Sequence, residues 1–275
     1  MERVVLITGA GSGIGLASAL EAARLGFRVV ATTRTEEELD AVRKAVADAH
    51  LPSGEVEAEV LDVTDEEQGR RLLQAHRPWA LVNNAAVVNA GLVIDTPPDE
   101  ARHQFDVMVH APIRLAQLAL PGMRRAGGGR IVNISSIASD TTVPMLGWYQ
   151  AAKAALSSVS DVLRQEVAHF GIEVVLIEPG IIDTPIWGKT AEDLRRRRAV
   201  APETQPYDEV LDVVEEIDGR GTGDAEVARV VGTALHAGKP RFRYRVGAAH
   251  NALPLVNRFI PTSLRDRVGR KLEAL

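Results

Sequence analysis

The chain has 275 residues, 45% of them apolar and 25% charged, with a formal net charge of −5 and no cysteine. This composition is typical of a globular protein with a large core, and the acidic balance gives no reason to expect nucleic-acid binding. Disulfides, thiolate nucleophiles and cysteine-ligated metals are excluded, and the histidines lack ligand spacing, so no catalytic metal is expected. No apolar run reaches membrane-spanning length and a strand begins within three residues, so we expect no integral membrane segment, no signal peptide and a cytoplasmic location.

A strand and a glycine-rich turn open the chain. Residues 4–7 are continuously apolar, which is typical of a strand covered on both faces. A turn follows, and then a helical pattern over 16–25. Backbone N–H groups at glycines can approach an anion closely, and a helix N-terminus favours phosphate. A turn that needs glycine only for its dihedral angles is the alternative. The candidate cofactor-binding residues here are Gly9, Gly11, Ser12, Gly13, Ile14 and Gly15.

The spacing of this turn, T-G-x-x-x-G-x-G over 8–15, differs from the common G-x-G-x-x-G dinucleotide fingerprint. It resembles the short-chain dehydrogenase/reductase family, specifically its compact single-domain branch. The resemblance implies a Rossmann-type, doubly wound α/β fold, with residues 1–275 forming one catalytic domain that binds a nicotinamide dinucleotide.

The second strand, predicted over 28–33, ends beside Arg34. Thr33 stands where NAD-preferring members of the family carry Asp. The phosphate of NADP carries about −1.5 to −2 charges, and a guanidinium can bond it bidentately. Arg34 therefore predicts NADP(H) as the cofactor. Residues 35–38 have the pattern of a capping box, so their glutamates are interpreted as a solvated helix start and not as ribose ligands.

The third strand, predicted over 56–63, ends at Asp62 and Val63, and a second capping box follows at 64–67. The resemblance implies that Asp62 and Val63 meet the adenine ring. The alternative is that Asp62 only supports the turn.

The fourth strand, predicted over 79–83, leads into Asn84 and Ala85. By the resemblance, Asn84 and Ala85 also belong to the cofactor site, and the asparagines at this strand end tie the central strands together.

A long helical pattern over 99–125 contains the main departure from the family. Met108 stands where the family has its fourth catalytic residue, an asparagine. That asparagine helps to hold a water molecule of a proton relay, in part through its backbone carbonyl, which Met108 also has. We expect a weakened or rearranged relay. The alternative is a cofactor-binding regulator with little turnover.

A fifth strand over 130–135 leads to Ser136, and the next helix, over 148–170, carries Tyr149 and Lys153. Four residues apart, these two side chains share one helical face. A free tyrosine has a pKa of about 10, and one ammonium at about 4 Å supplies about 4 kcal/mol at an effective dielectric of about 20. We therefore predict that Lys153 lowers the pKa of Tyr149 by two or three units.

These three residues are the candidate catalytic residues. Tyr149 would act as the acid and base, and Ser136 would donate a hydrogen bond to the substrate carbonyl or alkoxide. The resemblance further implies that Tyr149 and Lys153 contact the cofactor, with Lys153 on the nicotinamide ribose.

The sixth strand is predicted over 173–177. The residues after it match the family pattern P-G-x-I-x-T, which by the resemblance contacts the nicotinamide carboxamide. They are Pro179, Gly180, Ile182 and Thr184.

A long segment over 185–223 lacks strand character and is interpreted as the substrate lid, with a helical patch at 208–217. Residues Arg195–Arg198 within it are interpreted as a solvated helix face. A phosphorylated carrier or another anion could alternatively meet them.

A helix over 224–237, a seventh strand over 241–246 and a C-terminal tail over 248–275 complete the chain. An apolar stripe in the tail predicts packing on its own domain or on a partner subunit. The alternation of strands and helices predicts a seven-stranded parallel sheet with helices on both faces. The resemblance implies a homodimer or homotetramer.

The resemblance implies an NADP(H)-dependent oxidoreductase that interconverts an alcohol and its carbonyl on an apolar small molecule, either steroid- or retinoid-like or another hydrophobic ketone. A ketoacyl-thioester reductase, a regulator with little turnover, and an isomerase or dehydratase that uses the same Tyr–Lys pair are the alternatives.

Overall fold

The computed structural model describes residues 3–51, 55–184, 186–201, 204–217, 219 and 221–247. The predicted tail over 248–275 lies outside the described residues. Within the described part of the chain, no helix combines the length and the apolar character needed to cross a lipid bilayer.

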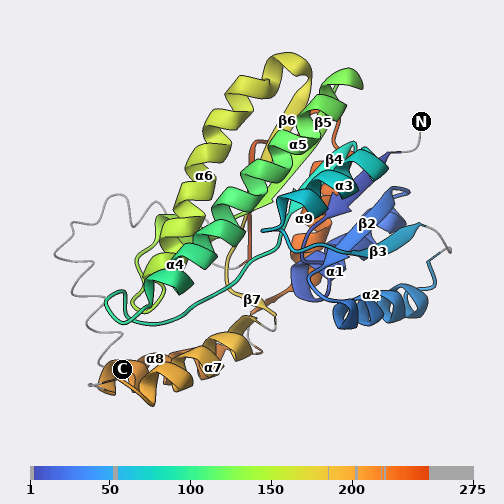
Figure 1. The fold of residues 1–275 in the computed structure, drawn as a ribbon. Helices are drawn as coiled ribbons and strands as arrows, with labels where there is room; N and C mark the ends of the chain where they lie inside the picture. The colour runs from blue at the N-terminus through green and yellow to red at the C-terminus, as the bar shows by residue number, and fades with distance from the viewer. Residues whose placement is uncertain are drawn as a thin grey trace.

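Seven parallel strands form the central sheet in the order β3-β2-β1-β4-β5-β6-β9 (Figure 1). This arrangement confirms the predicted doubly wound α/β fold. The order reverses direction between β1 and β4, and the crevice at such a point is where open α/β sheets bind ligands. The strands are β1 (Val4–Ile7), β2 (Arg28–Thr33), β3 (Val56–Val60), β4 (Ala80–Asn83), β5 (Gly129–Ile134), β6 (Ile172–Pro179) and β9 (Arg243–Val246).

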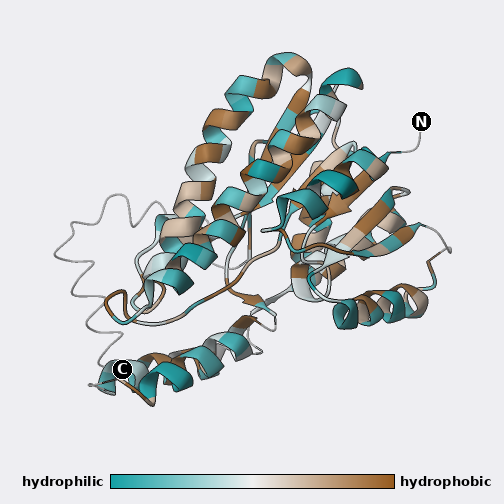
Figure 2. Ribbon diagram, viewed as in Figure 1, coloured by the Kyte–Doolittle hydropathy of each residue, from teal (hydrophilic) through white to brown (hydrophobic). Residues whose placement is uncertain are grey.

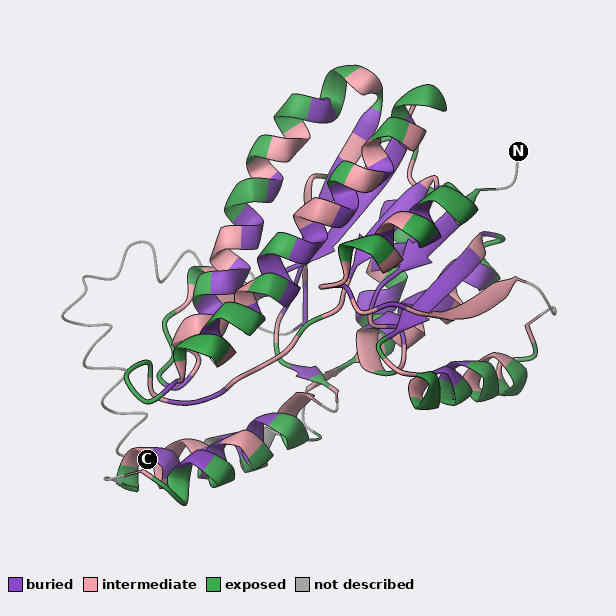
Figure 3. Ribbon diagram, in the orientation of Figure 1, coloured by how far each residue is buried: buried purple, intermediate pink, exposed green. Residues whose placement is uncertain are grey.

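Helices cover both faces of the sheet, because the central strands β1, β4, β5 and β6 are buried on both faces, whereas the edge strands β3 and β9 are only partly buried. One core cluster joins the sheet to α1, α2 and α9, and a second joins it to α3, α5 and α6. Figure 2 shows the hydrophobic strands and Figure 3 the exposed outer surfaces of the helices. The helices of these layers are α1 (Gly13–Arg24), α2 (Glu36–Asp48), α3 (Glu66–His76), α5 (Ala111–Arg125), α6 (Gly147–Val167) and α9 (Asp224–His236).

Several helix starts differ from the predictions. Helix α1 begins at Gly13, inside the glycine turn, and not at residue 16. The capping box expected at the start of α2 does not form, because Thr35 makes no side-chain cap bond. Helix α3 is capped by Asp65 and not by Thr64, since the Thr64 hydroxyl and N–H both donate to Asp62. The third strand also ends earlier than expected, at residue 60.

The helical segment predicted over 99–125 is divided into three parts. Helix α4 (Pro98–Phe105) passes into a π-helical turn, η1 (Asp106–His110), and then into α5. Met108 lies in the π-helical turn and is 1% exposed. The periodicity of the sequence did not reveal this turn.

The segment after β6 contains more regular structure than predicted. Besides α8 (Gln205–Ile217), it forms α7 (Ile186–Arg198) and a small parallel pair, β7 (Ile182–Asp183) with β8 (Thr222–Gly223). Helix α7 was missed because it is mostly hydrophilic, as Figure 2 shows. In Figure 1, α7 and α8 lie side by side, set off from the layers that flank the sheet.

Buried polar side chains connect the central strands, as expected for the asparagines. Asn83 Nδ2 donates to Asn133 Oδ1 at 2.8 Å, which joins the ends of β4 and β5. Asn84 Nδ2 donates to the carbonyl oxygens of Thr8 and Gly9 at 2.9 and 3.0 Å, which joins β4 to the glycine turn. The edge from which the site is built is therefore fixed by hydrogen bonds as well as by the sheet.

Candidate active site

A cavity of about 1590 Å³ lies at the carboxyl ends of the central strands. It is lined by every candidate site residue except Gly15, so segments that are far apart in the sequence meet there. These lining residues are Gly9, Gly11, Ser12, Gly13, Ile14, Arg34, Asp62, Val63, Asn84, Ala85, Ser136, Tyr149, Lys153, Pro179, Gly180, Ile182 and Thr184.

The glycine turn is shaped by close backbone approach. Gly9 has φ +65°, and a Cβ there would lie 2.8 Å from Ala85 Cα. A Cβ on Gly15 would overlap the Gly9 carbonyl oxygen and Asn84. Gly15 therefore packs α1 against the turn and is not among the residues that line the cavity, so its contact with a cofactor stays a prediction.

The first turn of α1 faces the cavity, and the side chain of its N-cap residue does not accept a hydrogen bond from its backbone N–H groups. Ser12, the N-cap residue, makes no side-chain cap bond, and the first turn contains no acidic residue. The orphan N–H groups of a helix N-terminus and its dipole favour an anion. These residues thus fit the pyrophosphate of a dinucleotide cofactor.

At the adenosine end of the cavity, Arg34 is exposed and lies beside acidic residues of α2. The backbone N–H of Arg34 donates to Glu38 Oε2 at 3.0 Å, and both Glu37 and Glu38 line the cavity. All three glutamates stand in the first turn of α2, as predicted, and Glu37 and Glu38 line the cavity as well. Asp62 also lines the cavity, while its carboxylate accepts the two hydrogen bonds from Thr64 that shape the turn.

Ser136, Tyr149 and Lys153 meet on the same wall of the cavity. Lys153 is 3% exposed, its Nζ donates to the Ile134 carbonyl oxygen at 2.8 Å, and it lies 5.7 Å from the centre of the Tyr149 ring. Ser136 Oγ accepts from the Ala138 N–H at 3.0 Å and lies 3.5 Å from the Pro179 carbonyl oxygen. This arrangement can combine a proton donor, a cation and a hydrogen-bond donor around one substrate oxygen.

The pKa of Tyr149 departs from the prediction. Although the residue is only half-buried as a whole, desolvation of its hydroxyl end raises the pKa of Tyr149 to about 12, against a hydrogen bond with Ser136 that lowers it. Desolvation also lowers the pKa of Lys153 to about 8. The expected lowering of the Tyr149 pKa by Lys153 is therefore wrong for this structure, because desolvation of the hydroxyl is the largest influence on that pKa.

Hydrogen bonds between β5 and α6 fix the position of these residues. Ser135 Oγ lies 2.8 Å from Ser157 Oγ and donates to the Lys153 carbonyl oxygen at 3.2 Å. Asn133 Nδ2 donates to Ser160 Oγ at 2.8 Å, one turn further along α6. The helix that carries Tyr149 is thus held to the strand that leads to Ser136.

Met108 is not among the residues that line the cavity. Its side chain lies in the core cluster that joins the sheet to α3, α5 and α6. The Met108 side chain therefore does not face the cavity, and the amino group of Lys153 donates a hydrogen bond to the backbone of β5.

The far part of the cavity is roofed by α7 and α8 and is mostly apolar, although Lys189, Thr190 and Glu192 of α7 also line it. Trp187 Nε1 donates to the Ile182 carbonyl oxygen at 2.7 Å, which holds the start of α7 near the end of β6. The apolar lining residues here are Val88, Ala90, Val143, Met145, Leu146, Ile186, Trp187, Leu194, Val210 and Val214.

The arginine run of α7 is paired within the molecule. Arg197, with a 7% exposed side chain, bonds to the Glu100 carboxylate of α4, and Arg196 lies 3.4 Å from the same carboxylate. Arg195 pairs with Glu215 and Arg198 with Asp208, both on α8. The interpretation as a solvated helix face is therefore wrong for Arg197. Its ion pair with Glu100, called the latch below, joins α7 to α4.

A second bond supports this latch. The hydroxyl of Tyr207, a fully buried residue of α8, donates to Asp95 Oδ2 at 2.8 Å. Gly91 leaves the space that the Arg197 side chain crosses, because a Cβ there would lie 2.6 Å from Arg197 Cδ. Both roof helices are consequently tied to the segment between β4 and α4.

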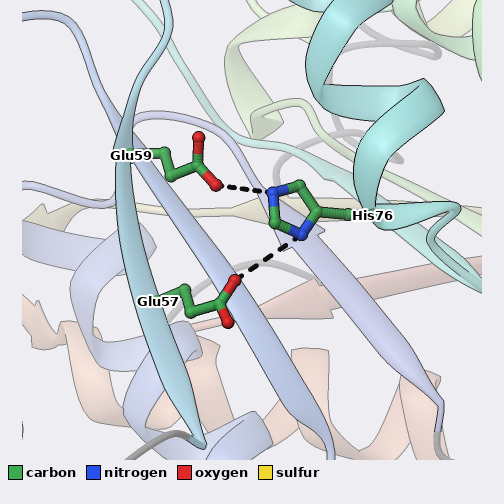
Figure 4. A group of neighbouring side chains, drawn as sticks. All are labelled: Glu57, Glu59 and His76. Carbon is green, nitrogen blue, oxygen red and sulfur yellow. Dashed lines mark hydrogen bonds and ion pairs between the residues drawn. The ribbon is translucent and has the colours of Figure 1, made fainter.

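One group with possible metal ligands lies away from the cavity, on β3 and α3. His76 lies between two carboxylates, with Nε2 2.5 Å from Glu59 Oε1 and Nδ1 3.6 Å from Glu57 Oε2 (Figure 4). Arg28 also bonds to Glu57, at 2.8 Å. One ligand atom from each of the three side chains lies within 4.8 Å of the other two, and the carboxylates are already paired with His76 and Arg28.

Comparison with known proteins assigns the chain to a family. The family model described as short chain dehydrogenase matches residues 3–195. The chain therefore belongs to the short-chain dehydrogenase/reductase family, as its motifs indicated, and is an oxidoreductase of that family.

Relatives match the chain along nearly its whole length. The uncharacterized oxidoreductase YusZ of Bacillus subtilis (strain 168) is 34% identical, covering 98% of this chain and 98% of that protein. The NADPH-dependent 3-dehydrocapnine reductase of Ornithobacterium rhinotracheale is 31% identical, covering 98% and 96%. A short-chain dehydrogenase structure from Streptomyces avermitilis is 32% identical with a TM-score of 0.77, covering 98% and 95%.

Related structures contain both nicotinamide dinucleotides. A metagenomic short-chain oxidoreductase in complex with NADP is 28% identical with a TM-score of 0.68, covering 89% of this chain and 96% of that one. A Burkholderia phymatum protein of the same family in complex with NAD is 24% identical with a TM-score of 0.80, covering 97% and 95%, which shows the fold alone. The family therefore implies a nicotinamide cofactor without deciding between the two.

Some residues of the site were missed at the sequence level. Thr8 accepts hydrogen bonds from the backbone N–H groups of Asn84 and Ala85, at 3.0 and 3.1 Å, and so fixes the strand end beside the glycine turn. Its place in the glycine motif was the available signal. Glu38 and Arg197 gave no signal, because a glutamate in a first helical turn and an arginine in a charged run are usually solvated.

We predict that Arg197→Met loosens the roof of the cavity. The substitution leaves the partly buried Glu100 with only the longer contact to Arg196, so the free energy of unfolding should fall by about 2 kcal/mol. Urea denaturation measures this loss, and limited proteolysis should cut within 186–217 faster. Arg195→Met, which removes an exposed pair, should change stability by less than about 0.5 kcal/mol. Equal effects of the two variants would show that Arg197 is not a latch.

Proposed function

We propose that this chain is an NADP(H)-dependent oxidoreductase that interconverts an alcohol and its carbonyl on an apolar small molecule, with Tyr149 as the acid and base. The observation that carries the proposal is the convergence of Ser136, Tyr149 and Lys153 on a cavity that also contains the glycine turn. Few other site types combine an anion-binding turn with a buried Tyr–Lys pair.

The chemistry follows from the positions of these side chains. A nicotinamide cofactor, when bound, supplies or accepts the hydride. In reduction, Ser136 orients the carbonyl oxygen by a hydrogen bond, and the Tyr149 hydroxyl gives that oxygen its proton. In oxidation, the Tyr149 phenolate takes the proton back from the alcohol. Lys153, whose pKa burial lowers to about 8, lies beside the Tyr149 ring and, while protonated, would place a positive charge near the phenolate.

Arg34 supports NADP(H) over NAD(H). Its guanidinium is exposed at the adenosine end of the cavity, and Thr33 beside it carries no charge that would repel a 2′-phosphate. The Thr33 hydroxyl is already used, because it donates to the Thr35 carbonyl oxygen at 3.0 Å. The name of the Ornithobacterium rhinotracheale relative, an NADPH-dependent reductase, agrees with this choice.

The apolar roof supports a hydrophobic substrate of steroid or retinoid type. Transfer of such a molecule from water to these side chains is favourable by about 25 cal/mol per Å² of apolar surface. A ketoacyl-thioester reductase is disfavoured, since Arg195–Arg198 are all paired with carboxylates and are not free for a carrier phosphate.

Two alternatives remain predictions of the sequence. The regulator with little turnover rests on Met108, whose side chain is buried outside the cavity. An isomerase or dehydratase would form product without net consumption of the cofactor. The homodimer or homotetramer also stays a prediction, and Val159 and Val162 on α6 are exposed apolar residues that such an interface could cover.

We predict that Tyr149→Phe lowers kcat for an accepted carbonyl substrate by about 10²- to 10⁴-fold, because the proton donor is lost. The dissociation constant for NADPH should change by less than about threefold, because the phenyl ring keeps its contacts. Steady-state kinetics and nucleotide fluorescence measure the two quantities. Tyr244→Phe, which removes a hydroxyl outside the cavity, is the matched control. Full turnover by Tyr149→Phe would refute the assignment of the acid.

We predict opposite pH dependences for the two directions. The pKa of Tyr149, about 12, keeps the phenol protonated for reduction, whereas the pKa of Lys153, about 8, means that its ammonium is lost as the pH rises further. Reduction should therefore be constant below about pH 7 and decline above about pH 8. Oxidation needs the phenolate and should rise by about tenfold per pH unit. Profiles of kcat/KM with the same shape in both directions would contradict this assignment.

We predict that Arg34→Ala weakens NADPH binding by about tenfold or more, because a charge-assisted bond to the 2′-phosphate is lost. NADH binding should remain within about twofold, as expected for an exposed side chain without a phosphate partner. Arg43→Ala on α2, where Arg43 pairs with Asp40, is the control. Fluorescence titration provides the dissociation constants, and an equal effect on both nucleotides would contradict the preference for NADPH.

A further inference from the structure

Glu38 occupies an unusual place for a residue in the first turn of a helix. It is half-buried, lines the cavity and lies directly against the glycine turn. A Cβ on Gly11 would lie 3.3 Å from Glu38 Cβ and 3.6 Å from its Oε2. The carboxylate is therefore a fixed part of the adenosine end of the cavity, while Glu36 of the same turn does not line it.

A backbone bond holds this carboxylate in place. Oε2 accepts the Arg34 N–H at 3.0 Å, so Glu38 is tied to the residue whose guanidinium attracts a phosphate. The N-terminal dipole of α2 further stabilises a negative charge at this position. Glu37, which is exposed, also lines the cavity, and its pKa is lowered by a hydrogen bond from the Thr35 side chain. The adenosine end thus presents the carboxylates of Glu37, Glu38 and Asp62 and one guanidinium.

These charges act in opposite directions on the two nucleotides. A carboxylate accepts a hydrogen bond from a ribose hydroxyl, as acidic residues do in NAD-binding sites. The same charge repels a 2′-phosphate, which carries about −1.5 to −2 charges. Thr33 offers neither effect, since it is uncharged and its hydroxyl is engaged with Thr35. Of the two glutamates that line the cavity, Glu38 alone is half-buried against Gly11 and bonded to the Arg34 N–H, so we take it as the acid that meets the ribose.

We propose that Glu38 is a specificity-determining residue that accepts a hydrogen bond from the adenosine ribose of NAD(H) and opposes the 2′-phosphate that Arg34 attracts. The inference rests on the proposed cofactor site and deepens it. The chain consequently binds both nucleotides, with a preference for NADPH that Glu38 limits.

Glu38→Gln tests the charge, because the glutamine amide oxygen can still accept the Arg34 N–H. Dissociation constants for NADPH and NADH are measured by nucleotide fluorescence on the full chain. We expect tighter NADPH binding and weaker NADH binding, so that the ratio of the two constants shifts toward NADPH by about tenfold. Glu36→Gln removes a neighbouring charge outside the cavity and should shift the ratio by less than about twofold.

Glu38→Ala is the second variant, for use if thermal unfolding shows that Glu38→Gln is unstable. It should shift the ratio of the NADPH and NADH dissociation constants in the same direction. Binding of both nucleotides with a ratio that Glu38→Gln and Glu38→Ala leave unchanged would overturn the role of Glu38 alone. Failure of both nucleotides to bind the unmodified chain would overturn the proposed cofactor site, and this inference with it.

Discussion

Buried hydrogen bonds between β5 and α6 are the constraint on which the candidate site depends. Asn133 to Ser160, Ser135 to Ser157 and Lys153 to the Ile134 carbonyl all join the strand to the helix. In a low-dielectric interior, a polar group without its partner is costly, so these bonds permit one register of helix against strand. That register brings Ser136 and Tyr149 to the same cavity wall. Proton transfer at this wall would therefore depend on polar contacts behind it that touch no ligand.

The two ends of the cavity differ in chemical character. The end proposed for the adenosine is formed by the glycine turn, the N-terminus of α1, and Arg34 with Glu38, whose carboxylate accepts the Arg34 backbone N–H. The opposite end is apolar, and its roof is held to α4 by the bond between Arg197 and Glu100. A dinucleotide would thus suit the first end of the cavity and a hydrophobic substrate the second. Tyr149 lines the same cavity, where the two ligands would meet.

Much of this arrangement could be predicted from the sequence, because strands, glycine turn and Tyr–Lys spacing are local patterns. Three features could not. Met108 lies in a π-helical turn that leaves no mark in the hydrophobic periodicity, and the contact of Glu38 with Gly11 requires the crossing of α2 over the turn. Burial of Arg197 depends on an acid about a hundred residues away in the chain. The prediction of a lowered Tyr149 pKa failed for a related reason, since desolvation depends on how the site is packed and cannot be read from the spacing of residues.

The central claim is that this cavity transfers a hydride to a carbonyl carbon of an apolar substrate. The most direct measurement uses NADPH deuterated at C4 of the nicotinamide, a panel of apolar ketones and aldehydes, and mass spectrometry of the products. If NADPH carries deuterium at both C4 positions, we expect an alcohol with one deuterium on the former carbonyl carbon, together with one equivalent of oxidised cofactor. Product formed without deuterium and without net oxidation of the cofactor would contradict it and would favour isomerisation or dehydration.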